Sequence, residues 1–255
     1  MIQNGGAQII ITDGGIEYQG SGVLIINTHT NSKGITEDHV IFFRMNDMNG
    51  VYDLPGGRCE NDHASIEQTA SIELYEESRK TISIKPTILQ TLPSVAIDGR
   101  ATGLRGKFKC YICRVQHIST KIYNDNMSIF DKLISIDNTS FNGNVAMQQK
   151  LKDRLKSYLE TNKLCRIPVK NIESLLGTTN TICMDDEGIL VTLSRQSVRV
   201  YMEARRTNKI PKCLPNGLLE KNKLIDLGKG TEAPNDSHTY IPKIGPKLQG
   251  RTIYY

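Results

Sequence analysis

The sequence contains no tryptophan, few aromatic residues (6%) and no long apolar run. Its longest apolar stretches, residues 22–26 and 40–43, are far shorter than the roughly 20 residues that a helix needs to cross a bilayer. The first residues, MIQNGG, include no basic segment that leads into an apolar one, so no secretory signal is expected. These absences exclude a membrane protein, and we expect a cytoplasmic one.

A zinc-binding or disulfide framework is also not indicated. Only Cys110 and Cys113 of the six cysteines lie close together, in KFKCYICRV, whose alternation is typical of a strand. Residues three apart on a strand point to opposite faces, so these two thiols cannot share a ligand. No second pair has the spacing of a zinc finger, and the five histidines are scattered. We interpret the cysteines as buried free thiols, with a zinc site as the alternative.

Positive charge is concentrated in the last quarter of the chain. Residues 195–255 hold 12 of the 32 lysines and arginines but only 5 of the 27 aspartates and glutamates. Five of the nine prolines follow Thr207, where hydrophobic periodicity fades. We therefore predict one domain over residues 1–207 and a basic tail, containing proline and glycine, over residues 208–255. Such a tail can attract phosphate-rich partners, RNA included, although a merely solvated tail is the simpler interpretation.

Strand patterns dominate the first fifty residues and then change to a helical one. AQIIITD and IEYQGSGVLIINT flank Asp13-Gly14-Gly15, as in a β-hairpin, and HVIFFRM and VYDL predict two further strands. Between residues 64 and 78 the apolar residues recur every four positions. Ile66, Ala70 and Leu74 would then form one apolar stripe on a helix.

The remainder of the chain repeats both patterns. TISIKPTILQTL, GKFKCYICRV and LCRIPV predict strands, and NTICMDDEGILVTL predicts a hairpin. VAMQQKLKDRLKSYLETN is typical of a helix, as is SRQSVRVYMEARR with Ser194 as its N-cap. Residues 116–160 are interpreted as an extended insertion, irregular between 116 and 143. Strands, a helix, then strands again predict an α/β (α+β) fold with a mixed sheet and helices on its faces.

Residues 54–80, LPGGRCENDHASIEQTASIELYEESRK, concentrate carboxylates beside a glycine turn. Spacings of three and four place Glu73, Glu76 and Glu77 on one side of a helix, where like charges repel. A divalent cation such as Mg²⁺, which prefers oxygen ligands, would offset that repulsion. Solvated glutamates on an exposed helix are the alternative. The glycines of residues 55–57 permit a tight turn and a close backbone approach to a ligand, which favours a metal site.

This segment resembles the Nudix box, whose pattern is G-x5-E-x7-R-E-U-x-E-E-x-G-U, where U is a bulky aliphatic residue. PGG at 55–57 matches the loop of the box, and ELYEE at 73–77 matches the metal-binding part of its helix. The resemblance implies a Nudix-like α/β/α sandwich. It also implies that Glu73, Glu76 and Glu77 ligate Mg²⁺, or Mn²⁺ in its place, with the Gly56 carbonyl nearby.

The resemblance further implies a pyrophosphohydrolase, an enzyme that acts on acid anhydrides and cleaves a nucleoside-diphosphate-linked substrate. Glu73 or Glu160 would take the proton of the attacking water. Glu160 precedes LCRIPV, where the family has a late acidic residue; its alternative is a helix-terminal glutamate that faces solvent. We expect the nucleotide-derived substrate to contact Gly57, Arg58 and Arg44.

Two features would suit a larger partner. The long segment 116–160 and the basic C-terminal quarter leave room for a substrate such as capped RNA. A homodimer is compatible with the family, although no residue of this sequence demands one.

The first half of the box departs from the pattern. The spacing from Gly57 to Glu73 is one residue longer, so the first glutamate of the pattern falls on His63 or on Ala64, depending on the end from which it is counted. The acidic residues near enough to replace it are Glu60, Asp62 and Glu67.

The second half departs as well, because Ile72 replaces the arginine of the pattern and Arg79 replaces its closing glycine. The helix then lacks its usual glycine C-cap, and Arg79 is a candidate replacement for the lost cation. These changes favour, as an alternative, a weak or inactive Nudix-fold module that binds a nucleotide or RNA. A third interpretation is an unrelated α/β interaction protein.

Overall fold

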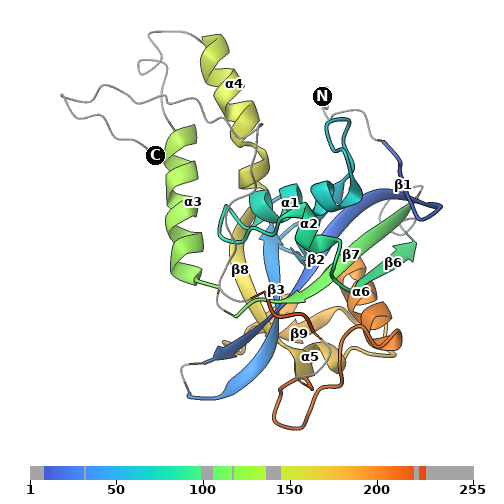
Figure 1. The fold of residues 1–255 in the computed structure, drawn as a ribbon. Coiled ribbons are helices and arrows are strands. Elements are labelled where there is room, and N and C mark those ends of the chain that lie inside the picture. Colours follow the sequence, from blue (N-terminus) through green and yellow to red (C-terminus); the bar gives the residue numbers. More distant parts are fainter. Residues whose placement is uncertain are drawn as a thin grey trace.

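The computed structural model describes residues 9–31, 33–98, 106–116, 118–135, 145–220 and 224–227. Its centre is an eight-stranded mixed sheet with the main order β4-β3-β2-β7-β6, in which β1 and β5 also pair with β2 and β8 pairs with β3 (Figure 1). Only β2 and β7 run parallel. The strands are β1 (Ile11–Asp13), β2 (Ile16–Thr30), β3 (Thr36–Met45), β4 (Tyr52–Asp53), β5 (Gly56–Arg58), β6 (Ser94–Asp98), β7 (Lys107–Arg114) and β8 (Thr161–Pro168).

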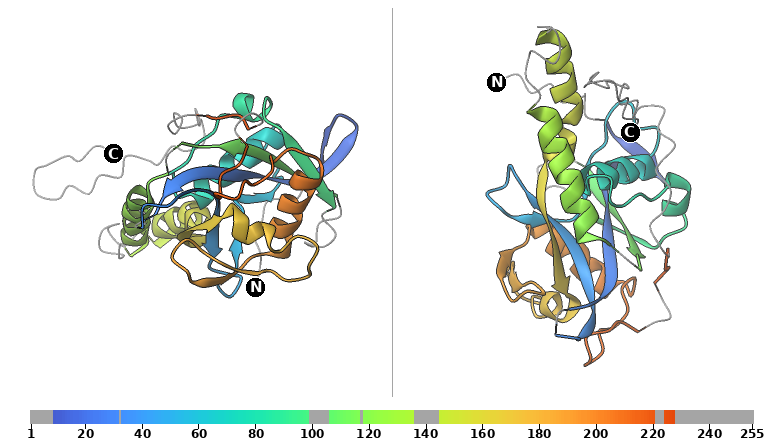
Figure 2. Two further views of the ribbon diagram at one scale, coloured as in Figure 1. Left: turned by 90° about the horizontal axis from the view of Figure 1, so that it is seen from below. Right: turned by 90° about the vertical axis from the view of Figure 1, so that its left-hand side faces the viewer.

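Helices cover both faces of this sheet (Figure 2). The alternation of β2 directs Leu24 and Ile26 to one face and Val23 and Ile25 to the other, so that the chain has two cores. The first core includes residues of α5 (Val169–Glu173) and α6 (Arg195–Arg206). The second includes residues of α1 (Ile66–Glu77) and α2 (Pro86–Leu89). The predicted α/β/α sandwich with a mixed sheet is confirmed.

Most of the elements predicted from local patterns are present. Asp13 pairs with Ile16 across the Gly14-Gly15 turn, and both glycines have positive φ, as a two-residue hairpin turn requires. The C-terminal hairpin forms from β9 (Ile182–Met184) and β10 (Leu190–Thr192). The side chain of Ser194 caps α6 by accepting a bond from the Ser197 amide.

Two local predictions are wrong. Residues 81–92 do not form a strand: Pro86 begins the short helix α2, since proline suits the first turn of a helix. Residues 120–134 are not irregular but form α3 (Thr120–Ile134), despite their many asparagines and aspartates. Tyr123 and Phe130, seven residues apart, are buried along one side of α3, and this packing outweighs the low helix propensity.

The segment 116–160 is therefore helical over much of its length. Helix α4 (Val145–Leu155) and the 3₁₀ helix η3 (Ser157–Leu159) follow α3. α3 and α4 lie side by side and project beyond the sheet near α1 (Figures 1 and 2). Among the described residues, no helix combines the length and apolar character that a bilayer crossing requires.

The cysteines lie in the described part of the chain as free thiols, and all but Cys213 are buried, as predicted. Cys110 and Cys113 point into different cores, one on each face of the sheet. The single group in the described residues with metal-ligand spacing contains no cysteine. These observations agree with the predicted free thiols rather than with a zinc site.

The start of the C-terminal segment packs onto the domain. Ile210 and Leu219 are buried, and the Leu219 amide donates to Asp38 Oδ2 at 2.7 Å. Asp38 is itself buried and accepts two bonds from the Arg114 guanidinium, at 2.6 and 2.9 Å. The predicted tail thus includes residues that complete this ion pair; residues 221–223 and 228–255 lie outside the described part of the chain.

Replacing Asp38 tests this arrangement. In Asp38→Asn we expect the free energy of unfolding to fall by about 3 kcal/mol, because the buried Arg114 charge loses its partner. Urea denaturation followed by circular dichroism would measure the change. Asp125→Asn, which removes the exposed ion pair with Lys121, is the matched control and should change little. Equal effects of the two substitutions would contradict the buried pair.

Candidate metal and substrate site

Residues 55–57, here called the glycine turn, bend at Pro55 and then enter β5, so Gly56 and Gly57 are strand residues without positive φ and not the predicted tight turn. This segment and α1 meet because the two glycines have no side chains. β5 crosses β2 so closely that a β-carbon on Gly56 would lie 2.7 Å from the Gly22 Cα. A β-carbon on Gly57 would overlap the carboxylate of Glu73. The second glycine of PGG therefore leaves the space that the Glu73 carboxylate occupies.

α1 presents its carboxylates to this turn because its opposite side is held by the sheet. Ile66, Ala70 and Leu74 are at most 1% exposed, which confirms the predicted apolar stripe. Glu77, 2% exposed, extends to the turn, where the Gly56 amide donates to its Oε2 at 3.0 Å. Glu73 and Glu76 are half-buried on the same helix.

Burial and, after it, the charges of neighbouring carboxylates disfavour the ionised forms of these acidic residues. Burial, followed by Glu76 and Glu160, holds the pKa of Glu73 well above its ordinary value. Burial and then Glu73 do the same to the pKa of Glu77, with Asp53 and Glu160 adding to the effect. Carboxylates from α1, β4 and η3 thus share one region, although they are far apart in sequence.

Glu160 joins this region from the end of η3. It is solvent-exposed, and its backbone carbonyl accepts a bond from the Asn46 amide at 2.8 Å. Partial burial and then Asp47 raise the pKa of its carboxyl, while Lys156 acts in the opposite direction. Glu160 therefore lies within electrostatic range of the α1 carboxylates, as its predicted role requires.

Asp53 is a member of this region that the sequence patterns did not identify. Its Oδ1 accepts bonds from the hydroxyls of Ser194 and Ser197, at 2.6 and 2.5 Å, and from the Leu54 amide at 2.8 Å. Burial nevertheless raises its pKa. Its only sequence signal was its position just before the Pro-Gly-Gly turn.

Of the described residues, the single group with metal-ligand spacing is His63 with its acidic neighbours, and it includes none of the α1 carboxylates. One ligand atom of each of Glu60, Asp62 and His63 lies within 4.8 Å of the others. The Glu60 amide donates to His63 Nδ1 at 3.1 Å, so in the neutral ring Nε2 carries the proton and has no lone pair for a metal. Burial, moreover, lowers the pKa of His63. Of this group, Glu60 alone adds charge near Glu73.

Glu67, the third acidic residue considered as a replacement, is engaged elsewhere. It is buried and accepts a bond from the Tyr111 hydroxyl at 2.5 Å. Lys109 Nζ lies 3.4 Å from the same oxygen. Glu67 therefore fastens the start of α1 to β7.

The two arginines predicted to bind substrate are both exposed. Arg58 ends β5, directly after the glycine turn. Arg44 pairs in register with Lys163 of β8, and its guanidinium packs over Gly50. Neither arginine is among the principal groups that shift the pKa of Glu73, Glu77 or Glu160.

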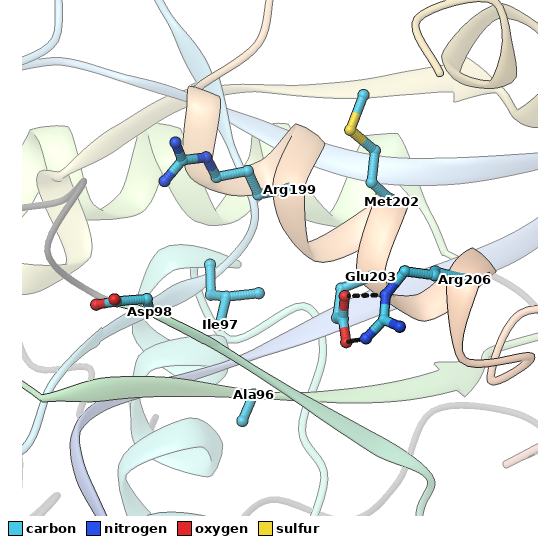
Figure 3. A pocket seen from close by; sticks show the side chains of 7 residues that line it. All are labelled: Ala96, Ile97, Asp98, Arg199, Met202, Glu203 and Arg206. Atoms are coloured by element: carbon cyan, nitrogen blue, oxygen red, sulfur yellow. Dashed lines mark hydrogen bonds and ion pairs between the residues drawn. The ribbon is translucent and has the colours of Figure 1, made fainter. Parts of the chain in front are cut away.

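A separate hollow of about 380 Å³ lies between β6 and α6, on the other face of the sheet from α1. Figure 3 shows Ile97 and Asp98 of β6 facing Arg199 and Met202 of α6, with Glu203 paired to Arg206. It contains none of the predicted site residues.

No protein-family model matches the sequence, and no curated protein matches it. Several solved structures are similar to the chain. The NUDIX domain of Shewanella oneidensis NrtR, complexed with ADP ribose, is 13% identical, with 74% of this chain and 86% of that chain covered and a TM-score of 0.38. A MutT/nudix family protein from Enterococcus faecalis is 14% identical (76% and 64% covered, TM-score 0.38).

An Ap4A hydrolase from C. elegans is 12% identical, with 40% of this chain and 68% of that chain covered and a TM-score of 0.29. The first two of these neighbours are described as a NUDIX domain and a MutT/nudix family protein. At such identities the likeness concerns the fold alone.

The repulsion among the carboxylates predicts an unusual pH dependence of stability. Because the pKa of Glu77 is raised in the folded chain above its ordinary 4.5, the folded state binds the proton more tightly than the unfolded state. Without metal, stability should therefore fall as the pH rises above about 4.5 and through the folded pKa. Thermal unfolding in chelator between about pH 5 and pH 8 measures this loss.

Glu77→Gln keeps an acceptor for the Gly56 amide but removes the charge. At about pH 8 in chelator we expect its Tm to exceed that of the wild type by about 2–4 °C, the shift that roughly 1 kcal/mol produces in a chain of this size. Glu187→Gln, on an exposed turn, is the control and should change nothing. A lower Tm for Glu77→Gln would contradict the proposed repulsion.

Proposed function

We propose that the chain is a divergent Nudix-type hydrolase that uses Mg²⁺ to cleave the pyrophosphate bond of a nucleoside-diphosphate-linked substrate. The observation that carries this proposal is the convergence of Glu73 and Glu77 on the Gly56-Gly57 turn. The two halves of the box, separated by residues 58–72 of divergent sequence, come together in space. On an ordinary solvated helix the glutamates would point to solvent and would not contact Gly56 and Gly57.

The residues present suit a hard divalent cation. All the candidate ligands are oxygen atoms, from Glu73, Glu76, Glu77 and the Gly56 carbonyl, which Mg²⁺ prefers and Mn²⁺ accepts. Burial and then the charges of neighbouring carboxylates raise the pKa values of Glu73 and Glu77, so their ionised forms are disfavoured and repel one another. A bound cation would remove that repulsion, so binding should stabilise the fold.

When bound, the metal would activate water and neutralise phosphate charge. The chain's own residues would accept the proton of the water and orient the substrate. Glu160, exposed beside the α1 carboxylates, is placed to accept the proton of the attacking water, with Glu73 as the other candidate. The Gly56 amide holds one oxygen of Glu77. Gly57, Arg58 and Arg44 would orient the substrate.

The substrate class extends from small nucleotide derivatives to capped RNA, for which the α3–α4 projection and the basic C-terminal segment provide surface. We place the protein in the cytoplasm, in agreement with its free thiols. A homodimer remains part of this proposal. The alternative is a weak or inactive module that binds a nucleotide or RNA. Ile72 favours it, because that turn of α1 carries no cation to hold a glutamate.

Hydrolysis of a substrate panel separates the enzyme from the binding module. The panel contains ADP-ribose, NADH, diadenosine polyphosphates, oxidised nucleotides, nucleotide sugars and capped RNA, each with Mg²⁺, Mn²⁺ or chelator. We expect metal-dependent phosphate release that Glu76→Gln and Glu77→Gln abolish, because each removes a charged ligand. Folded protein that turns over nothing, yet binds a nucleotide, would establish the alternative.

Glu160→Gln tests the assignment of the base. We expect kcat to fall by about 10²–10⁴-fold, the usual contribution of a positioned general base. The Mg²⁺ concentration for half-maximal stabilisation should change little, because the α1 carboxylates remain. If the activity of Glu160→Gln equals that of the wild type, Glu160 is not the general base and Glu73 is the remaining candidate.

A further inference from the structure

The residue that ends α1 adopts a conformation that favours glycine, yet it is an arginine. Arg79 has a φ of 51°. Its amide donates to the Glu76 carbonyl at 2.9 Å, and the Lys80 amide donates to the Tyr75 carbonyl at 2.8 Å. This pair of bonds is the usual ending of a helix whose next residue is glycine. A side chain that is retained in this strained place needs a compensating interaction.

The Arg79 side chain connects α1 with the start of β8. It is 2% exposed, and its Nε donates to the Thr161 carbonyl at 3.0 Å, an acceptor that its Nη2 shares. The Thr161 hydroxyl donates in return to the Glu77 carbonyl at 2.7 Å. These bonds join residues more than eighty positions apart, immediately after Glu160.

A second contact involves Tyr158, which precedes Glu160 in the chain. The Lys80 ammonium lies over the rings of Tyr158, Tyr75 and Phe130, at 5.1, 5.6 and 5.8 Å from their centroids. Tyr158 belongs to η3 and stacks on Phe130 of α3 at 4.7 Å. Lys80 therefore contacts the chain before Glu160, at Tyr158, and Arg79 binds it directly after Glu160, at Thr161.

We infer that Arg79 is a positioning residue: it fixes Glu160 relative to the carboxylates of α1 through the Thr161 carbonyl. The inference rests on the proposed function, in which these groups act on one substrate. Glu77 and Glu160 are separated along the chain by α2, β6, β7 and the α3–α4 projection. A direct bond between the two elements is needed to keep their separation fixed, and a misplacement of about 1 Å can cost on the order of 100-fold in rate.

Arg79→Gly tests this inference, because glycine relieves the backbone while it removes the guanidinium. Asn208→Gly is the matched control: Asn208 has a φ of 52° and follows α6 with the same pair of bonds, its amide to the Arg205 carbonyl and that of Lys209 to the Ala204 carbonyl. Amide hydrogen exchange of peptides that cover residues 157–161 measures the coupling without any substrate. Arg79→Lys is the conservative variant.

In Arg79→Gly we expect exchange in residues 157–161 to quicken at least about tenfold, while peptides from β2 stay unchanged. Guanidinium chloride, well below denaturing concentration, should restore the protection, and sodium chloride should not. With a substrate from the hydrolysis panel, kcat should fall by about 10–100-fold at nearly constant KM. Arg79→Lys should lie between Arg79→Gly and the wild type, and Asn208→Gly should match the wild type in both measurements.

Unchanged exchange in residues 157–161, or an unchanged kcat, would overturn the inference. A uniform rise across all peptides would overturn it too, since Arg79 would then support the whole fold rather than one segment. If the wild type hydrolyses nothing, the proposed function fails, while the exchange experiment still decides whether Arg79 couples α1 to Glu160.

Discussion

The carboxylates at the end of α1, with Glu77 buried and Glu73 and Glu76 half-buried, are the constraint on which the rest of this structure depends. Glu73 and Glu77 have pKa values well above their ordinary range because burial and mutual repulsion disfavour their charged forms. A fold tolerates such a group only if strong packing elsewhere holds the helix that carries it. The apolar side of α1, sealed against β2 and β7, supplies that packing.

Packing on both faces of the sheet supports the region that contains these carboxylates. The first core packs β2 and β3 against α5 and α6, and β2 in turn carries the glycine turn through its pairing with β5. Asp53, held by the hydroxyls of α6, adds a further carboxylate from this side. The negative region is thus built from elements on opposite faces of the sheet, so neither half of the sandwich would assemble it alone.

The departures from the Nudix pattern also have distinct physical consequences. The lone pair of His63 Nδ1 accepts a bond from the Glu60 amide, so the ring is engaged locally and does not replace the missing glutamate. Arg79 adopts the conformation of the glycine it replaces and directs its guanidinium toward β8 and α3. Ile72 leaves one turn of α1 without a cation. The carboxylates and the glycine turn are retained, while the supporting contacts around them are rebuilt.

Local patterns were enough to predict the hairpin at Gly14-Gly15, the apolar stripe of α1 and a mixed sheet with helices on its faces, because periodicity and turn residues act over a few positions. They were insufficient for α3, where the burial of Tyr123 and Phe130 outweighs a polar composition. They could not identify Asp53 either, since its partners Ser194 and Ser197 lie some 140 residues away. The sequence by itself determined which residues carry the negative charge of α1. Only the tertiary structure decided which distant groups surround that charge, because hydrogen bonds and repulsion depend on distance in space and not along the chain.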